Sequence, residues 1–241
     1  MPDLRIVNPS TPLQAPTRTD AGAPPALTID VVYDFVCPWC LIGKRHLATA
    51  LEQLARLRPQ LEPQVRWHSI QLLPDTPWGG VPYQSFYVAR LGSPEAVAAR
   101  RAQVQQAGDA AGLRFAFERI RVMPNTAAAH DLVACVAGQG TAAQQAALID
   151  RLFAAYFLEG EDVGDPAVLE RAALACGYTR AGVADHLADT QRRRSVRARQ
   201  PLPAEYGMNG VPLFVLNGSL GLAGAQAPQT LLDAMLRALG D

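Results

Sequence analysis

Strand-forming sequence is confined to the two ends of this chain of 241 residues, and a long helical pattern separates them. The first strand-like region covers 27–36 and 65–72, and the second covers 212–223. Between them, the pattern over 82–200 is helical. The predicted element order is therefore β-α-β, a long helical insertion, and then β-β-α, which makes this an α/β protein.

The first region predicts a compact supersecondary unit. Leu27–Val36 is rich in β-branched and aromatic residues, as strands are. A helix is expected to begin at Cys37-Pro38, because proline suits the first helical position. It ends near Arg58. Val65–Leu72 predicts a second strand. Such a β-α-β unit predicts parallel pairing with a right-handed crossover.

The remaining elements follow from periodicity and start signals. Asn217-Gly218 predicts a hairpin turn, and the last helix runs from 228 to 239. We expect four segments: a disordered Pro-rich tail (1–26), a β-α-β half (27–78), a helical insertion (79–200) and a β-β-α half (201–241). The predicted insertion helices are 82–91, 94–112, 126–138, 141–158, 166–176 and 180–199.

Composition narrows the class of protein. Hydrophobic residues make up 49%, and 22 basic residues balance 22 acidic ones, which disfavours binding to nucleic acid or an acidic membrane. The sequence has no run of 18 apolar residues, so we expect no transmembrane helix. No apolar signal segment precedes Leu27. We therefore expect a cytoplasmic protein, in which the four cysteines are not structural disulfides.

Cys37-Pro38-Trp39-Cys40 is the strongest chemical signal. This spacing on the first helical turn brings two sulfurs within bonding reach, and the positive helix end favours the thiolate of Cys37. Cys40, one turn deeper, is placed to resolve a mixed disulfide. Trp39 is expected to form part of an apolar docking surface. A redox pair is the favoured interpretation.

Other interpretations of the cysteines are weaker. A structural disulfide over so short a loop stabilises by only about 2 kcal/mol. A zinc site needs four ligands, and only His46, Cys135 and Cys176 could join the pair, so we expect no metal. On their helices, Cys135 and Cys176 are expected to be small buried hydrophobes.

Asp34, three residues before Cys37, has two interpretations. As a buried carboxylate it accepts the proton of Cys40, acting as a proton relay. As an ordinary residue at a strand end it orders the turn.

The segment Tyr33–Gly43 resembles the active-site segment of DsbA-family thioredoxin-like proteins, in particular the FrnE-like branch. The resemblance covers about 28–240. It continues in Met123-Pro124-Asn125-Thr126, Ala129-His130, Ala155-Tyr156-Phe157, Glu159-Gly160, Gly210–Val215 and Gly224-Ala225-Gln226. It implies a thioredoxin-like fold with a large all-helical insertion. The chain departs from the pattern at Pro201 and Pro203, which should break a helix.

The resemblance also implies site residues. Pro212 is expected to be a cis proline facing the cysteine pair, with Val211 offering its backbone to a substrate. Pro38 and Trp39 would complete that substrate-binding surface. Asn125, His130 and Gln226 are cleft candidates, although helix capping explains Asn125 equally well.

The sequence thus predicts a thiol–disulfide oxidoreductase that uses its own redox-active disulfide, with protein or small-molecule thiol substrates and glutathione as a candidate co-substrate. One alternative is a glutathione-dependent isomerase or transferase similar to the 2-hydroxychromene-2-carboxylate isomerases, which typically carry Ser where Cys37 stands. Another is a non-catalytic, chaperone-like protein that binds partners in a cleft. The substrate, the direction of electron flow and the oligomeric state stay open.

Overall fold

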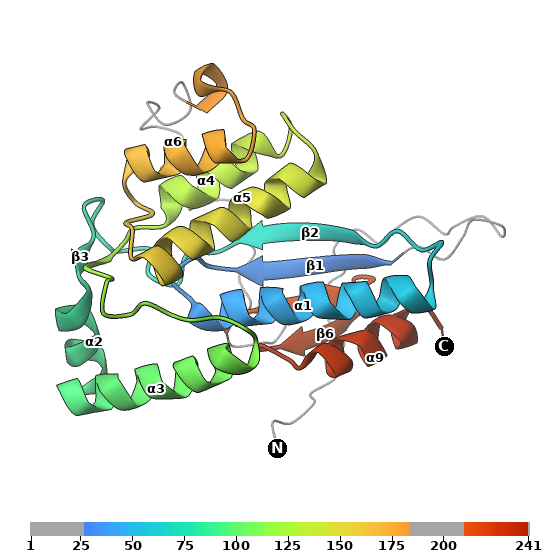
Figure 1. Ribbon diagram of the computed structural model, residues 1–241, viewed down its shortest axis with the longest axis horizontal. Coiled ribbons are helices and arrows are strands. Elements are labelled where there is room, and N and C mark those ends of the chain that lie inside the picture. Colours follow the sequence, from blue (N-terminus) through green and yellow to red (C-terminus); the bar gives the residue numbers. More distant parts are fainter. Residues whose placement is uncertain (1–26, 184–209, 241) are drawn as a thin grey trace. The chain divides into compact units, whose positions relative to one another are not determined.

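The computed structural model describes residues 27–183 and 210–240, which form two compact units (Figure 1). We call 27–33, 42–70 and 210–240 the sheet unit, and 34–41 with 71–183 the helical unit. The active-site segment 34–41 and the loop 71–78, expected in the first thioredoxin half, thus group with the helical residues. The expected tail (1–26), most of the helix 180–199 and the prolines at 201 and 203 lie outside the described residues.

The sheet unit contains a four-stranded mixed sheet in the order β2-β1-β5-β6. β1 and β2 are parallel, with Val31 opposite Trp67, which confirms the predicted β-α-β pairing. β1 and β5 are antiparallel, with Val31 opposite Phe214, as are β5 and β6. The strands are β1 (Thr28–Tyr33), β2 (Gln64–Ser69), β5 (Leu213–Leu216) and β6 (Leu220–Ala223).

Two helices cover one face of this sheet. They are α1 (Pro38–Leu57), whose residues from Ile42 onward belong to the sheet unit, and α9 (Pro228–Ala238). Alternate residues of the strands point toward these helices because side chains alternate across a strand. The resulting core contains Ile29, Val31, Leu47, Leu54, Phe214, Leu216, Leu231 and Met235, all at most 2% exposed.

Asn217 and Gly218 form the predicted hairpin turn between β5 and β6. Both have positive φ, 47° and 68°, which suits a tight turn between twisted strands. The Asn217 side chain also accepts a hydrogen bond from the Thr28 N–H at 2.9 Å and donates one to the Ala238 carbonyl at 2.9 Å. One side chain therefore fastens the turn to β1 and α9.

The helical unit has capped helices and one very short ladder. Ser93 and Asp165 accept hydrogen bonds from N–H groups of the first turns of α3 and α6, and Thr141 forms a capping box with Gln144 on α5. The two-residue strands were not predicted. The elements are β3 (Val81–Pro82), α2 (Tyr83–Leu91), α3 (Pro94–Ala110), β4 (Val122–Met123), α4 (Ala127–Val136), α5 (Ala142–Ala154), η1 (Ala155–Glu159) and α6 (Pro166–Ala175).

The helix expected to run unbroken over 141–158 changes its geometry near the end. α5 stops at Ala154, and the π-helical segment η1 follows and ends at Gly160, which has a φ of 77°. Ala155, Tyr156 and Phe157, which belong to this segment, are all buried. The rings of Phe35, Phe153 and Phe157 pack together in the core of this unit.

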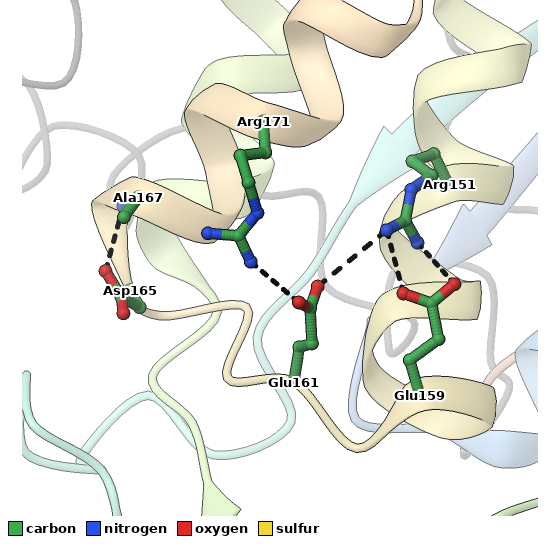
Figure 2. Close-up of polar contacts among 6 residues, drawn as sticks. All are labelled: Arg151, Glu159, Glu161, Asp165, Ala167 and Arg171. Atoms are coloured by element: carbon green, nitrogen blue, oxygen red, sulfur yellow. Dashed lines mark hydrogen bonds and ion pairs between the residues drawn. The ribbon is translucent and has the colours of Figure 1, made fainter.

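An exposed charge network joins α5, η1 and α6 (Figure 2). Arg151 makes a two-pronged ion pair with Glu159, at 2.9 and 2.8 Å, and lies 3.8 Å from Glu161. Arg171 completes the chain by binding Glu161 at 2.6 Å. Because these side chains are partly exposed, each pair contributes only about 0–1 kcal/mol.

Candidate active site

The cysteine pair lies at the start of α1, in the part of this helix that belongs to the helical unit. α1 starts at Pro38, so Cys37 precedes the helix directly, as predicted. The Cys37 N–H donates to the Asp34 carbonyl at 3.1 Å, and the Cys40 N–H donates to the Cys37 carbonyl at 3.0 Å. Neither cysteine is in a disulfide, and both are buried, with 7% and 2% of their surface exposed.

The two sulfurs have different surroundings. Burial raises the pKa of Cys40 well above its usual value of 9.0, and the hydrogen bond and charge of Cys37 raise it further. A hydrogen bond with the Asp34 backbone lowers the pKa of Cys40, whereas the charge of Asp34 raises it by a smaller amount. Cys40 therefore stays a thiol at neutral pH.

The charge that acts on this thiol belongs to a buried carboxylate–imidazole pair. Asp34 and His130 are both 0% exposed, and Oδ1 of Asp34 lies 3.0 Å from Nε2 of His130. The other carboxylate oxygen accepts the Leu72 N–H at 2.7 Å. The His130 ring packs against Phe35, with 4.8 Å between ring centroids. Sequence reasoning considered both residues but did not pair them, because 96 positions separate them and no motif links them.

Asn125 has a structural environment. Its Oδ1 accepts hydrogen bonds from the Ala127 N–H and the Gln71 side chain, both at 3.0 Å, and its Nδ2 donates to the Thr76 carbonyl at 2.6 Å. It therefore joins the start of α4, whose N-cap residue is Thr126, to the loop 71–76. Neither Asn125 nor His130 lines the pocket described next.

A pocket of about 410 Å³ opens at Cys37, and every residue that lines it belongs to the helical unit. Cys37, Pro38 and Trp39 form one part of its wall, so both residues between the cysteines face this space. The loop residues Leu72 and Leu73 also contribute. The remaining lining residues are Val36, Tyr83, Phe86, Tyr87, Arg90, Leu91, Val97, Arg100, Arg101, Val104, Phe117 and Met123.

Two tyrosines of α2 contribute phenol groups to this pocket. The rings of Tyr83 and Tyr87 meet edge to face at 4.9 Å, and the Arg101 guanidinium lies 5.1 Å from the Tyr83 ring centre. Burial raises the pKa of both phenols, and the charge of nearby Cys37 raises that of Tyr87 as well. Both phenols are therefore neutral hydrogen-bond donors at neutral pH. Sequence reasoning missed this cluster, because a Tyr-x-x-x-Tyr spacing on a helix is also common in a core.

The remaining predicted site residues belong to the sheet unit. The Val211–Pro212 peptide bond is cis. A Cβ on Gly43, three residues beyond Cys40 in α1, would lie 2.8 Å from Cγ of Pro212. The Gln226 carbonyl lies 2.8 Å from Nδ1 of His46, and its side chain donates to the Ala223 carbonyl.

The other two cysteines do not line the pocket at Cys37. Cys135 is on α4 and Cys176 ends α6, and both are partly buried. Burial raises the pKa of Cys176, which disfavours its thiolate. In 27–183 and 210–240 no three His, Cys, Asp or Glu side chains gather as metal ligands would. No helix in these ranges has the length and apolarity needed to span a membrane.

Comparisons with solved structures give related folds. A probable DsbA oxidoreductase from Streptomyces coelicolor has a TM-score of 0.77 and 26% identity, covering 89% of this chain and 91% of that one. The cytosolic disulfide reductase DsbM of Pseudomonas aeruginosa, also solved with GSH, has a TM-score of 0.61 and 20% identity, covering 87% and 98%. A 2-hydroxychromene-2-carboxylate isomerase has a TM-score of 0.58 and 17% identity, covering 87% and 95%.

A comparison with curated protein sequences gave no match. The model of the DSBA-like thioredoxin domain matches residues 28–236 and thus covers both strand-forming ends and the helices between them. The element order, the mixed sheet and the Cys-x-x-Cys at the start of α1 agree with that match. This chain therefore belongs to the family of DSBA-like thioredoxin domains.

Proposed function

We propose that this chain is a thiol–disulfide oxidoreductase whose Cys37–Cys40 pair exchanges disulfides with protein or small-molecule thiols. The observation that carries the proposal is the pair itself: Cys37 borders an open pocket, whereas Cys40 is a buried thiol beside a buried carboxylate. One sulfur is thus accessible to a substrate, and the other is shielded until the first has reacted.

The exchange has two steps. The Cys37 thiolate attacks one sulfur of a substrate disulfide, so that a Cys37–substrate disulfide forms and the other substrate sulfur leaves as a thiolate. Cys40 then loses its proton and attacks Cys37, which closes the Cys37–Cys40 disulfide and releases the second thiolate. Two electrons have passed from the protein to the substrate. Run in reverse, the same steps oxidise a substrate dithiol.

We assign the proton of Cys40 to Asp34 and His130. Their pairing at 3.0 Å, with both side chains fully buried, supports a relay in which Asp34 accepts the proton and His130 orients the carboxylate. The N–H of Leu72 holds the second oxygen in place. His130 is thus a positioning residue that sequence reasoning did not assign to this role.

The remaining assignments follow the resemblance. Val211 and Pro212 hold the partner in place, and Pro38 and Trp39 contact it. The protein belongs to the FrnE-like branch and acts in the cytoplasm. Glutathione is its co-substrate. In support, the similar fold of DsbM belongs to a cytosolic disulfide reductase that has also been solved with GSH.

A redox titration tests the proposal. The protein is equilibrated in graded mixtures of reduced and oxidised glutathione, and the state of Cys37 and Cys40 is read by alkylation and intact mass. A reversible internal disulfide is expected, with Cys37→Ser inactive and Cys40→Ser accumulating mixed disulfides. Full turnover by Cys37→Ser would contradict the assignment. A stable glutathione adduct, with activity on a small aromatic substrate that survives Cys40→Ala, would favour the isomerase alternative.

A further inference from the structure

The pocket at Cys37 has the size of a small-molecule site. Its volume of about 410 Å³ lies in the range of roughly 300–1,000 Å³ that ligand pockets occupy. Its walls come from the residues around Cys37, from α2 and α3, and from adjoining loops of the helical unit. A small disulfide can thus be enclosed with one sulfur at Cys37.

Most of the wall is apolar or aromatic. Phe86 and Tyr87 meet edge to face at 5.3 Å, and the ring of Tyr83 continues the aromatic surface. Val97 and Val104 of α3 add buried aliphatic surface. Flat aromatic or branched aliphatic groups bind well to such a wall because they bury apolar area and pack against ring edges.

The charges of the pocket all have one sign. Arg90, Arg100 and Arg101 line it, and none of its described lining residues is acidic. Within 27–183 and 210–240, these three arginines form no ion pair with a carboxylate. Cationic groups at a concave, apolar surface attract an anion more strongly than they do in open water.

Arg101 is the most constrained of the three. One terminal nitrogen donates to Gln84 at 2.7 Å, and the guanidinium lies against the Tyr83 ring. Its Nε is buried and has no hydrogen-bond partner among the described residues. The guanidinium is therefore held by its neighbours while part of its donor capacity is unused, which suits a carboxylate ligand.

From these observations we infer that the pocket binds small disulfides whose thiol half is an apolar, preferably aromatic, carboxylate. The apolar body lies on the wall formed by Tyr83, Phe86 and Tyr87, and the carboxylate lies toward Arg90 and Arg101. This inference rests on the proposed function, because it names the substrate class of the same cysteine pair. In the reduced protein, Cys37 forms a mixed disulfide with one half of the substrate, and the other half leaves as a thiol. Cys40 then attacks Cys37, which closes the Cys37–Cys40 disulfide and releases the bound half. Each disulfide consumed therefore releases two thiols.

A matched pair of probes tests the charge preference. Dithiodibenzoic acid and its neutral diamide have the same aromatic frame, and each is mixed with pre-reduced protein in a single turnover while thiol release is followed. The ratio of the two rates is divided by the ratio measured with dithiothreitol, which removes differences in intrinsic reactivity. We expect this corrected ratio to favour the acid.

Arginine variants locate the effect. Arg90→Met and Arg101→Met are each expected to lower the corrected ratio by about tenfold, the factor that corresponds to roughly 1.4 kcal/mol. The control is Arg114→Met, at an exposed position that does not line the pocket, and it should keep the wild-type ratio. A corrected ratio near one in the wild type, or one that neither pocket variant changes, would overturn the inference.

A second measurement separates this inference from the redox function. Naphthoate, which has no sulfur, should slow alkylation of Cys37 by iodoacetamide, whereas naphthamide should slow it less. Protection by naphthoate without turnover of either disulfide would keep the site and refute the oxidoreductase proposal. Turnover of both disulfides without selective protection by naphthoate would keep the oxidoreductase proposal and refute the carboxylate site.

Discussion

Asp34 acts on Cys40 in two opposing ways. As a charge, it adds to the burial and to the neighbouring Cys37 that raise the pKa of Cys40, and so it disfavours the thiolate. In the proposed relay, the same carboxylate, paired with His130, would accept the proton of Cys40. The two roles predict opposite effects when the carboxylate is removed.

Asp34→Asn decides between these roles. If the carboxylate accepts the proton, resolution of a Cys37 mixed disulfide at neutral pH slows by about a hundredfold, near the lower end of what general bases contribute. The rate should then rise about tenfold per pH unit up to the raised pKa of Cys40, because only the pre-formed thiolate reacts. Rapid-quench alkylation with mass spectrometry measures the rate. Faster resolution in the variant would mean that Asp34 acts only as a charge.

Glu118→Gln provides the control for this experiment. Glu118 is an exposed carboxylate of the helical unit, and its loss also removes one negative charge. It should leave the resolution rate and its pH dependence as in the wild type.

At the scale of elements, one side chain ties the hairpin between β5 and β6 to its neighbours. Asn217 has a φ of 47° and makes the two hydrogen bonds to Thr28 and Ala238. Asparagine tolerates left-handed backbone conformations better than alanine does. The Asn217 side chain therefore joins the turn to both β1 and α9.

Asn217→Ala should lower the free energy of unfolding by about 2–3 kcal/mol, since it loses both hydrogen bonds and keeps the left-handed conformation. Asn217→Asp retains an acceptor for the Thr28 N–H and tolerates the conformation, so its loss should be about 1 kcal/mol. Urea unfolding followed by circular dichroism measures both values. Equal losses would show that the hydrogen bond to Thr28 does not contribute.

The sequence predicted the elements better than it predicted their contacts. Strand composition, Cys37-Pro38 and Asn217-Gly218 are local signals, and the parallel β1–β2 pair, the start of α1 and the hairpin are found where they indicated. The Asp34–His130 pair depends on how α4 packs against the active-site segment, which no local pattern encodes. Likewise, the π-helical turn of η1 lies in an apolar run that helical periodicity reads as a continuation of α5.

For the whole molecule, several buried acids should set an alkaline limit to stability. Burial raises the pKa of Cys40 above its usual 9.0 and that of Tyr156 above its usual 10.0, and it does the same for Tyr83 and Tyr87. The native state therefore holds these protons more tightly than the unfolded state does. Stability from these groups is complete below about pH 9 and falls above it, by up to about 1.4 kcal/mol per pH unit for each group.

Unfolding in urea at a series of pH values, with a reductant present, tests this limit. The midpoint should be steady from about pH 7 to 9 and then decline, steeply once the tyrosines take part. Cys40→Ser should move the start of the decline toward about pH 10, where phenols begin to ionise. A midpoint that stays level to about pH 11 would show that these groups are not buried in the native protein.

The mixed sheet also has a consequence for synthesis. Thr28 at the start of β1 and its partner Asn217 are 189 residues apart, so a ribosome making about 5–20 residues per second needs roughly 10–40 s to supply the second after the first. All described residues of the helical unit emerge within that interval, whereas β1 has no partner on its β5 side. A nascent chain of this protein thus carries an unpaired strand edge through most of its translation, and that edge is what a ribosome-associated chaperone would encounter.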